Sequence, residues 1–344
     1  MEQAMRRHFF HHSDEALDAE KQNCHWCQIR KFATHSQYPI TIVNTEDDAM
    51  IEPNFRFMEI STRGDDVKPS RKEFLTGCEC KNDLDCQYSK CTCLQDVEDD
   101  SSGDEDTTSE EESSAEEYVD GWYRKKVYAY HSQGIKAGHL RSKVLMSRNP
   151  IYECHESCVC SPDCSNRVVE QGRKLPLQIF RTKNRGWGVR SPVDIKKGQF
   201  VDKYMGEIIT ATEATRRRAQ SHIAQKKDVY LFALDKFSDP DSLDPRLRGP
   251  PLEVDGEFIS GPTRFINHSC DPNLRIFARV GDHADKHIHD LAFFAARDIS
   301  RGEELTFDYI DGVDDSDMDA LDPEKQKDMT RCLCGSKNCR GYLW

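Results

Sequence analysis

The sequence predicts a mostly β fold with few helices, flanked by cysteine-rich zinc-binding segments. Three observations predict it. Residues 175–310 contain short apolar runs rich in Val, Ile, Phe and Tyr, separated by Gly, Pro and Asp. The same stretch holds one of the 15 cysteines, and the others are grouped before and after it. It also carries a single clear helix signal, so strands and helices do not alternate as in a doubly wound sheet.

Eight apolar runs predict short strands, because β-branched and aromatic residues between turn residues favour that structure. In chain order they are LQIF (177–180), WGVR (187–190), FVDKYMGEII (200–209), VYLFAL (229–234), LEVDGEFI (252–259), LRIFARV (274–280), LAFFAA (291–296) and ELTFDY (304–309). The pair Asp255-Gly256 in the fifth run is a hairpin signal. Phe265 and Ile266, in RFINHSC (264–270), also look like core strand.

One helix is expected to begin at Thr210, in the segment TATEATRRRAQSHIAQKK (210–227). Thr210 followed three residues later by Glu213 fits a capping box, in which each side chain bonds a backbone N–H at the first turn.

Nine cysteines surround an acidic segment and have spacings of C-x-C, C-x3-C and C-x4-C. They are Cys78, Cys80, Cys86, Cys91, Cys93, Cys154, Cys158, Cys160 and Cys164. Thiolates are soft ligands and tetrahedral zinc takes four of them. Three zinc ions balance nine thiolates if three of these bridge two metals. Two separate four-cysteine sites with one spare thiol remain the alternative.

The C-terminal cysteines Cys332, Cys334 and Cys339 are one ligand short of a tetrahedral zinc site. Cys270 is the obvious fourth ligand, which would pin the last residues beside Asn267 and His268. Cys24 and Cys27 have no obvious partners. Packing or surface exposure is favoured for them, and a weak metal site is the alternative.

Thirteen Asp and Glu residues and no Lys or Arg lie between Gln95 and Gly121, and they account for the whole net charge of −13. Such a run cannot bury a core, so we expect a disordered, solvated loop. A docking strip for a basic partner is the alternative. The formally neutral remainder argues against a zinc-dependent nucleic-acid binder, which needs a basic face.

No apolar run approaches the roughly 18 residues of a membrane span, and the first residues lack a secretory signal. We therefore expect an intracellular chain whose reduced thiols bind metal rather than form disulfides. The expected organisation is an N-terminal segment (1–77), a zinc cluster (78–164) interrupted by the acidic loop (95–121), a central domain (165–330) and a terminal zinc segment (331–344).

Four ordered motifs carry a family resemblance: NRGWGV (184–189), YMGEII (204–209), RFINHSC (264–270) and ELTFDY (304–309). With the two cysteine groups, which are similar to pre-SET and post-SET regions, they resemble SET-domain protein lysine methyltransferases over roughly residues 40–344. The combination is most similar to the suppressor-of-variegation group, which methylates lysine 9 of histone H3, and to its compact filamentous-fungal members. The resemblance implies the SET β-fold, with RFINHSC threaded as a pseudoknot under the ELTFDY segment.

The resemblance also implies roles for individual residues. Tyr309 would be the catalytic tyrosine, and Tyr204 would help to position the target amine. Phe307 and Trp344 would line the lysine channel, and Asp235 would contact the peptide. The implied S-adenosylmethionine pocket comprises Arg185, Gly186, Trp187, Tyr230, Arg264, Asn267 and His268.

The expected substrate is the histone H3 tail, with chromatin-recruiting proteins as further partners and no sequence-specific nucleic-acid or membrane binding. Phe307 lacks a hydroxyl that would restrain a methylated amine, so multiple methylation up to trimethyllysine is expected. The implied location is nuclear chromatin, and the implied role is gene silencing in heterochromatin. The alternatives are a methyltransferase for another lysine and a non-catalytic zinc-containing chromatin-binding protein. The second should have lost Tyr309, Asn267 or His268, which are all present.

Overall fold

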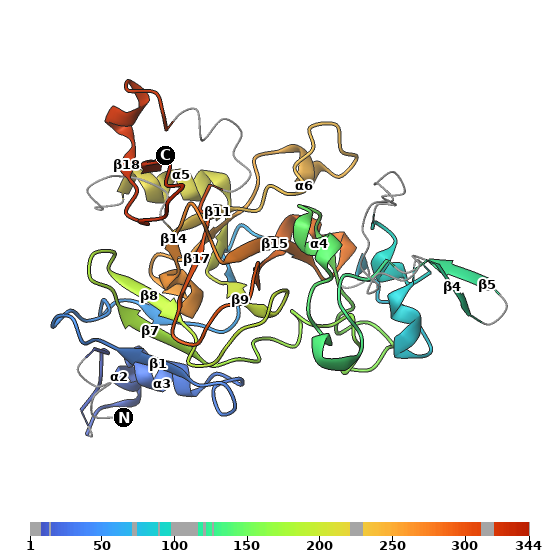
Figure 1. Ribbon diagram of the computed structural model, residues 1–344, viewed down its shortest axis with the longest axis horizontal. Coiled ribbons are helices and arrows are strands. Elements are labelled where there is room, and N and C mark those ends of the chain that lie inside the picture. Colours follow the sequence, from blue (N-terminus) through green and yellow to red (C-terminus); the bar gives the residue numbers. More distant parts are fainter. Residues whose placement is uncertain are drawn as a thin grey trace.

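Three small sheets surround the main core of the protein in the computed structural model (Figure 1). The structure describes residues 8–13, 15–70, 74–88, 90–97, 116–119, 122–125, 127–220, 230–310 and 320–343. Within these ranges no helix is long and apolar enough to cross a membrane.

The largest sheet has five strands in the order β1-β7-β8-β17-β14. Their bounds are β1 Ile40–Val43, β7 Leu177–Arg181, β8 Trp187–Arg190, β17 Glu304–Phe307 and β14 Asn267–His268. Inward residues alternate with more exposed ones along β7, as expected for a strand with one buried face. β14 and β17 pair in parallel, with His268 opposite Phe307, so two of the sequence motifs lie side by side. This is the pairing that the expected pseudoknot requires.

Two four-stranded sheets complete the central part, in the orders β11-β12-β10-β3 and β6-β15-β16-β9. The first consists of β11 Leu231–Ala233, β12 Glu253–Asp255, β10 Glu207–Ile209 and β3 Thr62–Arg63. The second consists of β6 Ile151–Tyr152, β15 Leu274–Val280, β16 Asp290–Ala295 and β9 Phe200–Tyr204. Three two-stranded pairs are formed by β2 Arg56–Phe57 with β13 Ile259–Ser260, β4 Glu116–Val119 with β5 Trp122–Lys125, and β18 Thr330–Arg331 with β19 Tyr342–Leu343.

The helices are short and lie around the sheets. The α-helices are α2 Asp18–Asn23, α3 His25–Arg30, α4 Ser142–Met146, α5 Ala211–Gln220 and α6 Pro245–Arg248. The 3-10 helices are η2 Asp83–Gln87, η3 Thr92–Leu94, η4 Gly134–Lys136, η5 Pro262–Phe265, η6 His283–Ile288 and η7 Lys325–Asp328. The predicted helix is α5, and Thr210 Oγ1 accepts a hydrogen bond from Glu213 N at 3.3 Å, which is one half of the predicted capping box. Residues 221–227 of that prediction lie outside the described residues.

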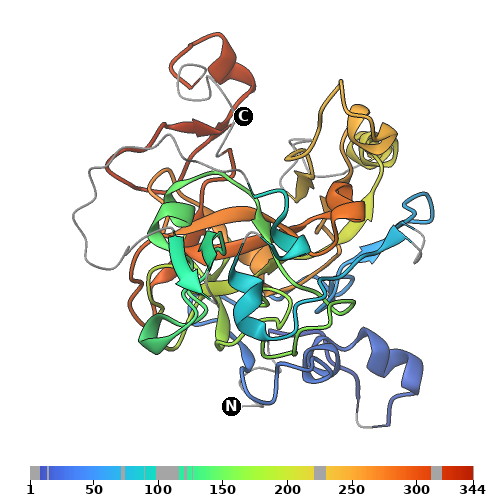
Figure 2. The same ribbon diagram turned by 90° about the vertical axis from the view of Figure 1, so that its right-hand side faces the viewer.

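The N-terminal segment is built into the central sheets. β1 pairs with β7, β2 with β13 and β3 with β10, all in parallel. Ile40 and Ile42 of β1 are buried in the same core as Ile179 and Leu305. Figure 2 shows this N-terminal part, in blue, at the end of the molecule away from the C-terminus.

The eight predicted strand regions all contain strands, and the mostly β fold with few helices is confirmed. The Asp255-Gly256 hairpin is wrong. β12 ends at Asp255 and pairs with β10 and β11, whereas the next strand, β13, pairs with β2. Gly256 is needed for a different reason, since a Cβ there would lie 2.5 Å from Tyr204 Oη.

The strand expected at Phe265 and Ile266 is also misplaced. Both residues are buried, but Phe265 ends the 3-10 helix η5, and the strand β14 begins only at Asn267. Most of the predicted acidic loop 95–121, and Trp344, lie outside the described residues.

Candidate active site

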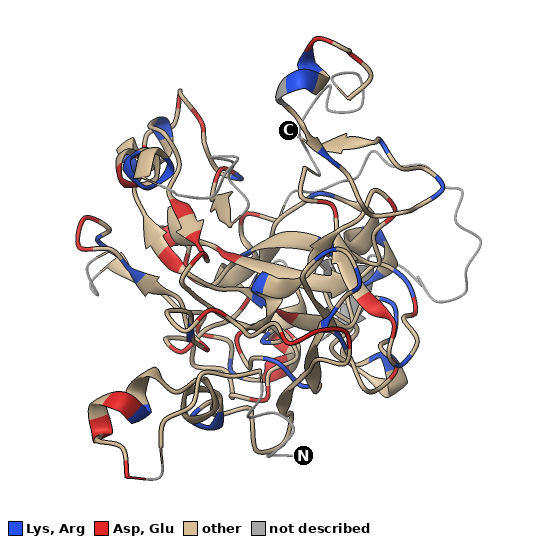
Figure 3. Cartoon of the chain, turned by 90° about the vertical axis from the view of Figure 1, so that its left-hand side faces the viewer, with Lys and Arg blue, Asp and Glu red and all other residues tan. Residues whose placement is uncertain are grey.

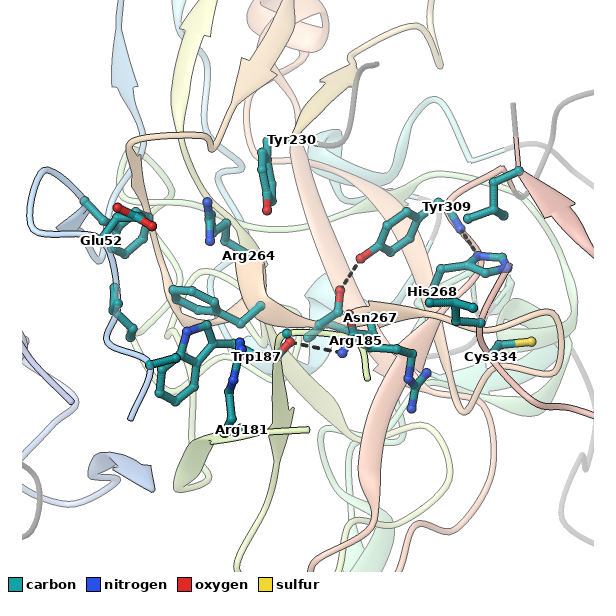
Figure 4. A pocket seen from close by; sticks show the side chains of 18 of the residues that line it. Glu52, Arg181, Arg185, Trp187, Tyr230, Arg264, Asn267, His268, Tyr309 and Cys334 are labelled. Atoms are coloured by element: carbon teal, nitrogen blue, oxygen red, sulfur yellow. Dashed lines mark hydrogen bonds between the residues drawn. The ribbon is translucent and has the colours of Figure 1, made fainter. Parts of the chain in front are cut away.

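A cavity of about 540 Å³ lies where the loop after β1, the β7–β8 turn, η5–β14 and the C-terminal segment meet. Figure 4 shows Trp187 and Arg181 on one side of it, with Tyr309 and His268 on the other. All seven residues predicted to bind the cofactor line this cavity, together with the predicted catalytic tyrosine. They are Arg185, Gly186, Trp187, Tyr230, Arg264, Asn267, His268 and Tyr309. Residues spread over more than a hundred positions of the sequence are therefore brought to one place.

The turn between β7 and β8 presents Arg185, Gly186 and Trp187 to the cavity. Gly186 has φ +73°, a left-handed conformation that favours glycine. Thr182 holds the turn closed, because its backbone N–H and its hydroxyl both donate to Gly186 O, at 2.8 and 2.9 Å. The Arg181 guanidinium lies 5.7 Å from the Trp187 ring centroid. The turn is thus fixed by its own sequence and by one cation–π contact.

Asn267 on β14 is held between two other strands. Its Nδ2 donates to Trp187 O at 3.0 Å and to Glu304 Oε1 at 2.8 Å. Glu304 also forms an ion pair with Arg185. This network couples β8, β14 and β17, so the amide and the guanidinium are kept in place at the cavity wall.

Arg264 places a half-buried guanidinium at the cavity. Its guanidinium carbon lies 4.0 Å from the Tyr230 ring centroid and 5.0 Å from that of Phe55, and Nη2 donates to Glu257 O at 3.2 Å. Arg264 Nε is buried and has no hydrogen-bond partner among the described residues. A buried donor of this kind needs an acceptor, and the chain leaves that place open to a ligand.

Tyr309 lies two residues after the end of β17 at Phe307. Its hydroxyl donates to Ile266 O at 2.6 Å, and its backbone N–H donates to His268 Nδ1 at 3.2 Å. Burial raises the pKa of the Tyr309 phenol, so the group stays protonated at neutral pH. The side chain is therefore oriented from both ends, with its oxygen lone pairs available to a substrate amine.

His268 connects Tyr309 to the C-terminal cysteines. Burial lowers the pKa of His268 to about 4, although the neighbouring Asp308 opposes this shift. The ring is therefore neutral at pH 7. Because Nδ1 accepts from Tyr309 N, the proton is assigned to Nε2, which lies 3.2 Å from Cys270 Sγ.

An aromatic cluster lies behind Tyr309. Phe307 is 2% exposed, and its ring centroid lies 4.7 Å from that of Tyr309 and 4.8 Å from that of Phe293. Tyr204 is 4% exposed and its hydroxyl donates to Tyr230 O at 2.9 Å. Tyr204 and Phe307 do not line the cavity itself. Both pack against Phe232 of β11, at 4.6 and 5.7 Å between ring centroids.

Two of the predicted substrate contacts remain predictions. Asp235 is exposed, lies just after β11 and does not line the cavity. Trp344 lies outside the described residues.

The C-terminal cysteines meet Cys270 as predicted. The Sγ atoms of Cys270, Cys332, Cys334 and Cys339 all lie within 4.8 Å of one another, and Cys270 and Cys332 are 3.8 Å apart. Cys332 and Cys334 also line the cavity, so this group of four thiols, the terminal cysteine cluster, holds part of the cavity wall.

The nine earlier cysteines form one continuous cluster. Their Sγ atoms fall into overlapping groups of four whose members all lie within 4.8 Å of one another. Cys78 and Cys154 each belong to at least three of these groups. Sharing of this kind is what bridging thiolates require, and both clusters have the soft donor set and the spacing that suit zinc.

Sequence reasoning missed several residues of the site. The loop 49–52, Phe55 and Arg181 line the cavity, and Phe232 completes the aromatic cluster. The loop lies in the N-terminal segment, far in sequence from every motif, and no local signal marks it. Phe232 lies two residues after Tyr230 in a predicted strand, so both side chains should point to the same face of the sheet. This alternation was the one signal that could have placed Phe232 at the site.

Comparisons with known proteins agree with this geometry. The SET domain model matches residues 186–310, and the Pre-SET motif model matches residues 32–167. The chain is 62% identical over 345 residues to the Neurospora crassa protein "Histone-lysine N-methyltransferase, H3 lysine-9 specific dim-5", and the match covers 100% of both chains.

Solved structures show the same likeness. The Neurospora SET domain protein DIM-5, a histone lysine methyltransferase, superimposes with a TM-score of 0.70 at 58% identity, covering 87% of this chain and 100% of that one. KRYPTONITE in complex with mCHH DNA, an H3(1–15) peptide and SAH gives a TM-score of 0.62 at 26% identity, covering 89% of this chain and 52% of that one.

The fold, the cavity and the cysteine clusters define a SET-domain methyltransferase with a pre-SET region. The chain belongs to the family of SET-domain histone-lysine N-methyltransferases. The predicted membership of the suppressor-of-variegation group, with its compact fungal members, is confirmed by the full-length match.

Proposed function

We propose that the chain transfers methyl groups from S-adenosylmethionine to lysine 9 of the histone H3 tail, up to the trimethyl product. The observation that carries this proposal is the cavity, in which all seven predicted cofactor residues lie beside Tyr309. The names of full-length relatives, which are H3 lysine-9 specific, support the choice of substrate.

The residues of the cavity fit S-adenosylmethionine chemically. The unpartnered Arg264 Nε and the guanidinium of Arg185 suit the carboxylate and polar groups of the cofactor. The partly exposed Trp187 ring offers a face for stacking. When bound, S-adenosylmethionine supplies an electrophilic methyl group, whose transfer leaves the bonding electron pair on sulfur.

The chain has to present a neutral lysine amine to that methyl group. At pH 7 deprotonation of a lysine with pKa about 10.4 costs about 4.6 kcal/mol. Removal of the amine from water, beside the buried Phe307 and the partly buried Phe232, disfavours the charged ammonium and so lowers this cost. The proton goes to water, and the hydroxyl of Tyr309 orients the amine lone pair for in-line attack.

A pH profile follows from these assignments. Burial raises the pKa of Tyr309, so the phenol remains protonated throughout the working range and contributes no titration there. The substrate lysine loses its proton as pH rises, so kcat should increase by about tenfold per pH unit until the bound lysine is titrated. Single-turnover rates between about pH 6 and 10 test this. A flat profile with chemistry rate-limiting would contradict the required deprotonation.

The substrate peptide is proposed to bind as an added strand. β11 is an edge strand of its sheet, and its Phe232 contacts the aromatic cluster around Tyr309. An extended peptide on this edge would gain backbone hydrogen bonds and place one side chain toward the cluster. Asp235, just beyond the strand, is the proposed contact for a basic residue, and Trp344 the proposed cover of the channel.

Phe307→Tyr is expected to shift products toward monomethyllysine. The Phe307 ring packs against that of Tyr309, and in the proposed channel an added hydroxyl would lie near the amine, where it would hold a water or restrain a methylated nitrogen. Mass spectrometry of the mono-, di- and trimethyl fractions over time is the measurement. Phe277→Tyr makes the same chemical change in a separate core and serves as the control. Unchanged product ratios in the Phe307 variant would refute this role.

The proposed metal content is three zinc ions in the nine-cysteine cluster and one in the terminal cysteine cluster. The four-thiol groups overlap at Cys78 and Cys154. This overlap supports a single cluster with bridging thiolates rather than two separate four-cysteine sites with a spare thiol. In this arrangement zinc would replace a hydrophobic core around the nine cysteines, because most of the buried residues packed together there are cysteines.

The proposed setting is nuclear chromatin, where the activity would support heterochromatin and gene silencing. Lys and Arg are interspersed with Asp and Glu over the drawn chain (Figure 3), whereas broad binding to nucleic acid needs a basic face. The histone tail and chromatin-recruiting proteins are the proposed partners.

Incubation with labelled S-adenosylmethionine and a panel of histone tail peptides tests the proposed function. We expect label on the H3 tail and none on the same peptide with arginine in place of lysine 9. Label on other tails would indicate a different target lysine. Absence of label on every peptide, from zinc-loaded protein that binds the cofactor, would indicate a non-catalytic chromatin-binding protein.

A further inference from the structure

Four zinc-ligand side chains gather near the start of the described chain, apart from both cysteine clusters. The sequence supplies them as an adjacent pair, His11 and His12, and as a C-x2-C pair, Cys24 and Cys27. His12 Nε2 lies 3.2 Å from Cys27 Sγ, and His11 Nδ1 lies 3.8 Å from Cys24 Sγ. Two histidines and two cysteines are a common donor set of structural zinc.

The two histidine–thiol separations, 3.2 and 3.8 Å, are close to those between ligands of one tetrahedral ion. With Zn–S of about 2.3 Å and Zn–N of about 2.0 Å, sulfur and nitrogen ligands lie about 3.5 Å apart, and two sulfurs about 3.8 Å apart. The thiols of the two cysteine clusters show the same spacing, at 3.8 Å for Cys78 with Cys86 and 3.8 Å for Cys270 with Cys332.

The tautomer of His12 is already the one that a metal ligand needs. His12 Nδ1 lies 2.6 Å from Ser13 O, a carbonyl that can only accept a hydrogen bond, so Nδ1 carries the proton. Nε2 is then an unprotonated nitrogen directed at Cys27. Histidines that bind zinc regularly donate their other ring N–H to a backbone carbonyl in this way.

His25, which lies between the two cysteines, has a different task. His25 is buried, its Nδ1 accepts from Phe10 N at 3.1 Å, and its Nε2 donates to Phe55 O at 2.7 Å. Both ring nitrogens are occupied, so His25 is a packing residue. Without His25, the candidate ligands are His11, His12, Cys24 and Cys27, and four is the number that a closed tetrahedral site requires.

We propose that His11, His12, Cys24 and Cys27 bind a structural zinc ion in addition to those of the cysteine clusters. Simple packing, which the sequence favoured for Cys24 and Cys27, does not account for two histidine nitrogens directed at the two thiols. The ion would join residues 8–13 to the first turn of α3. It would act without any part in the methyl transfer.

The proposed ion would secure a segment next to the cavity. Ile51 N donates to His8 O at 3.2 Å, and the His8 ring lies 6.5 Å from that of Trp187. Phe9 is fully buried against the main core. The zinc site would therefore keep His8 and Phe9 in place behind the loop 49–52 and Trp187, which are two parts of the cavity wall.

Zinc content of the full-length chain tests the proposal. Elemental analysis should give about five zinc ions per chain, and about four after Cys24→Ser with Cys27→Ser. His35→Ala is the matched control, because His35 lies in the same region but its Nδ1 accepts from Ile40 N and it contacts none of the four residues. That variant should keep the wild-type zinc content. Cobalt loading should add a Cys2His2 absorption signature that the double variant lacks.

Thiol alkylation of the unmodified protein decides the case even if the double variant does not fold. Cys27 is only half-buried and should still resist alkylation until a chelator is added. Rapid alkylation of Cys27 without chelator, together with a zinc content equal in the wild type and the double variant, would overturn the proposal. Neither readout depends on methyl transfer, so failure of the proposed function would leave this result unaffected.

Discussion

Tyr309→Phe is expected to lower kcat by about 10²–10³-fold, the usual effect of removing one preorganised polar group at a reacting centre. The Tyr309 ring would keep its packing against Phe307 and His268, and the backbone N–H would still donate to His268 Nδ1. What is lost is the hydroxyl that Ile266 O orients at 2.6 Å. Cofactor affinity should change by less than about threefold, since the ring and cavity shape persist.

Single-turnover methylation of an H3 peptide and equilibrium binding of S-adenosylhomocysteine together check this prediction. Tyr128→Phe makes the same chemical change at a ring that contacts Arg141, away from the cavity, and should leave kcat unchanged. A Tyr309→Phe enzyme with normal kcat, or one whose defect lies wholly in cofactor binding, would remove Tyr309 from the catalytic step.

Cys270→Ser is expected to remove one zinc ion per chain and to lower activity by about 100-fold or more, an effect comparable to the loss of a catalytic group. A hydroxyl is a poor replacement for a thiolate ligand of zinc. Without the ion, Cys332 and Cys334 would leave the cavity wall, and His268 would lose the sulfur that its Nε2 contacts at 3.2 Å. The main core does not include these cysteines, so the melting temperature of the central domain should change little.

Ser336→Ala provides the control for this variant. Ser336 lies within the same terminal segment and contacts Cys334 Sγ at 3.3 Å, but it is not one of the four thiols. Its zinc content and activity should match those of the unmodified protein. If Cys270→Ser lost its ion and kept full turnover, the terminal segment would not be needed to complete the cavity.

The cavity residues could be predicted because four motifs occur in the order and spacing of a known family, and that resemblance assigned Gly186, Asn267 and His268 to the cofactor pocket. Their conformations agree with the assignment, since Gly186 has φ +73° and Asn267 and His268 form the strand β14, but neither short motif would identify the pocket alone. The loop 49–52 and Phe232 could not be found in this way. Their place at the site depends on pairings of β1 with β7 and of β11 with β12, which no local pattern specifies.

The Asp255-Gly256 error has a similar origin. The letters fit a two-residue turn, but Gly256 is glycine because the Tyr204 hydroxyl lies where a Cβ would be. A glycine that is needed because a distant side chain leaves no space for a Cβ cannot be told from sequence apart from one that is needed for a turn conformation. For the same reason, the histidines that face Cys24 and Cys27 become ligand candidates only when the fold brings residues 11 and 12 beside α3.

The parallel pairings of the N-terminal segment also govern how this protein can acquire its structure. β1 pairs Ile40 with Leu177, and β2 pairs Arg56 with Ile259. These N-terminal strands therefore cannot pair until partner strands much later in the sequence have been synthesised. Closing such large loops is entropically costly and makes folding slow. The nascent chain would therefore expose Ile40 and Ile42 until β7 is made, and Phe57 until Ser260 is made, which would favour binding to chaperones and aggregation.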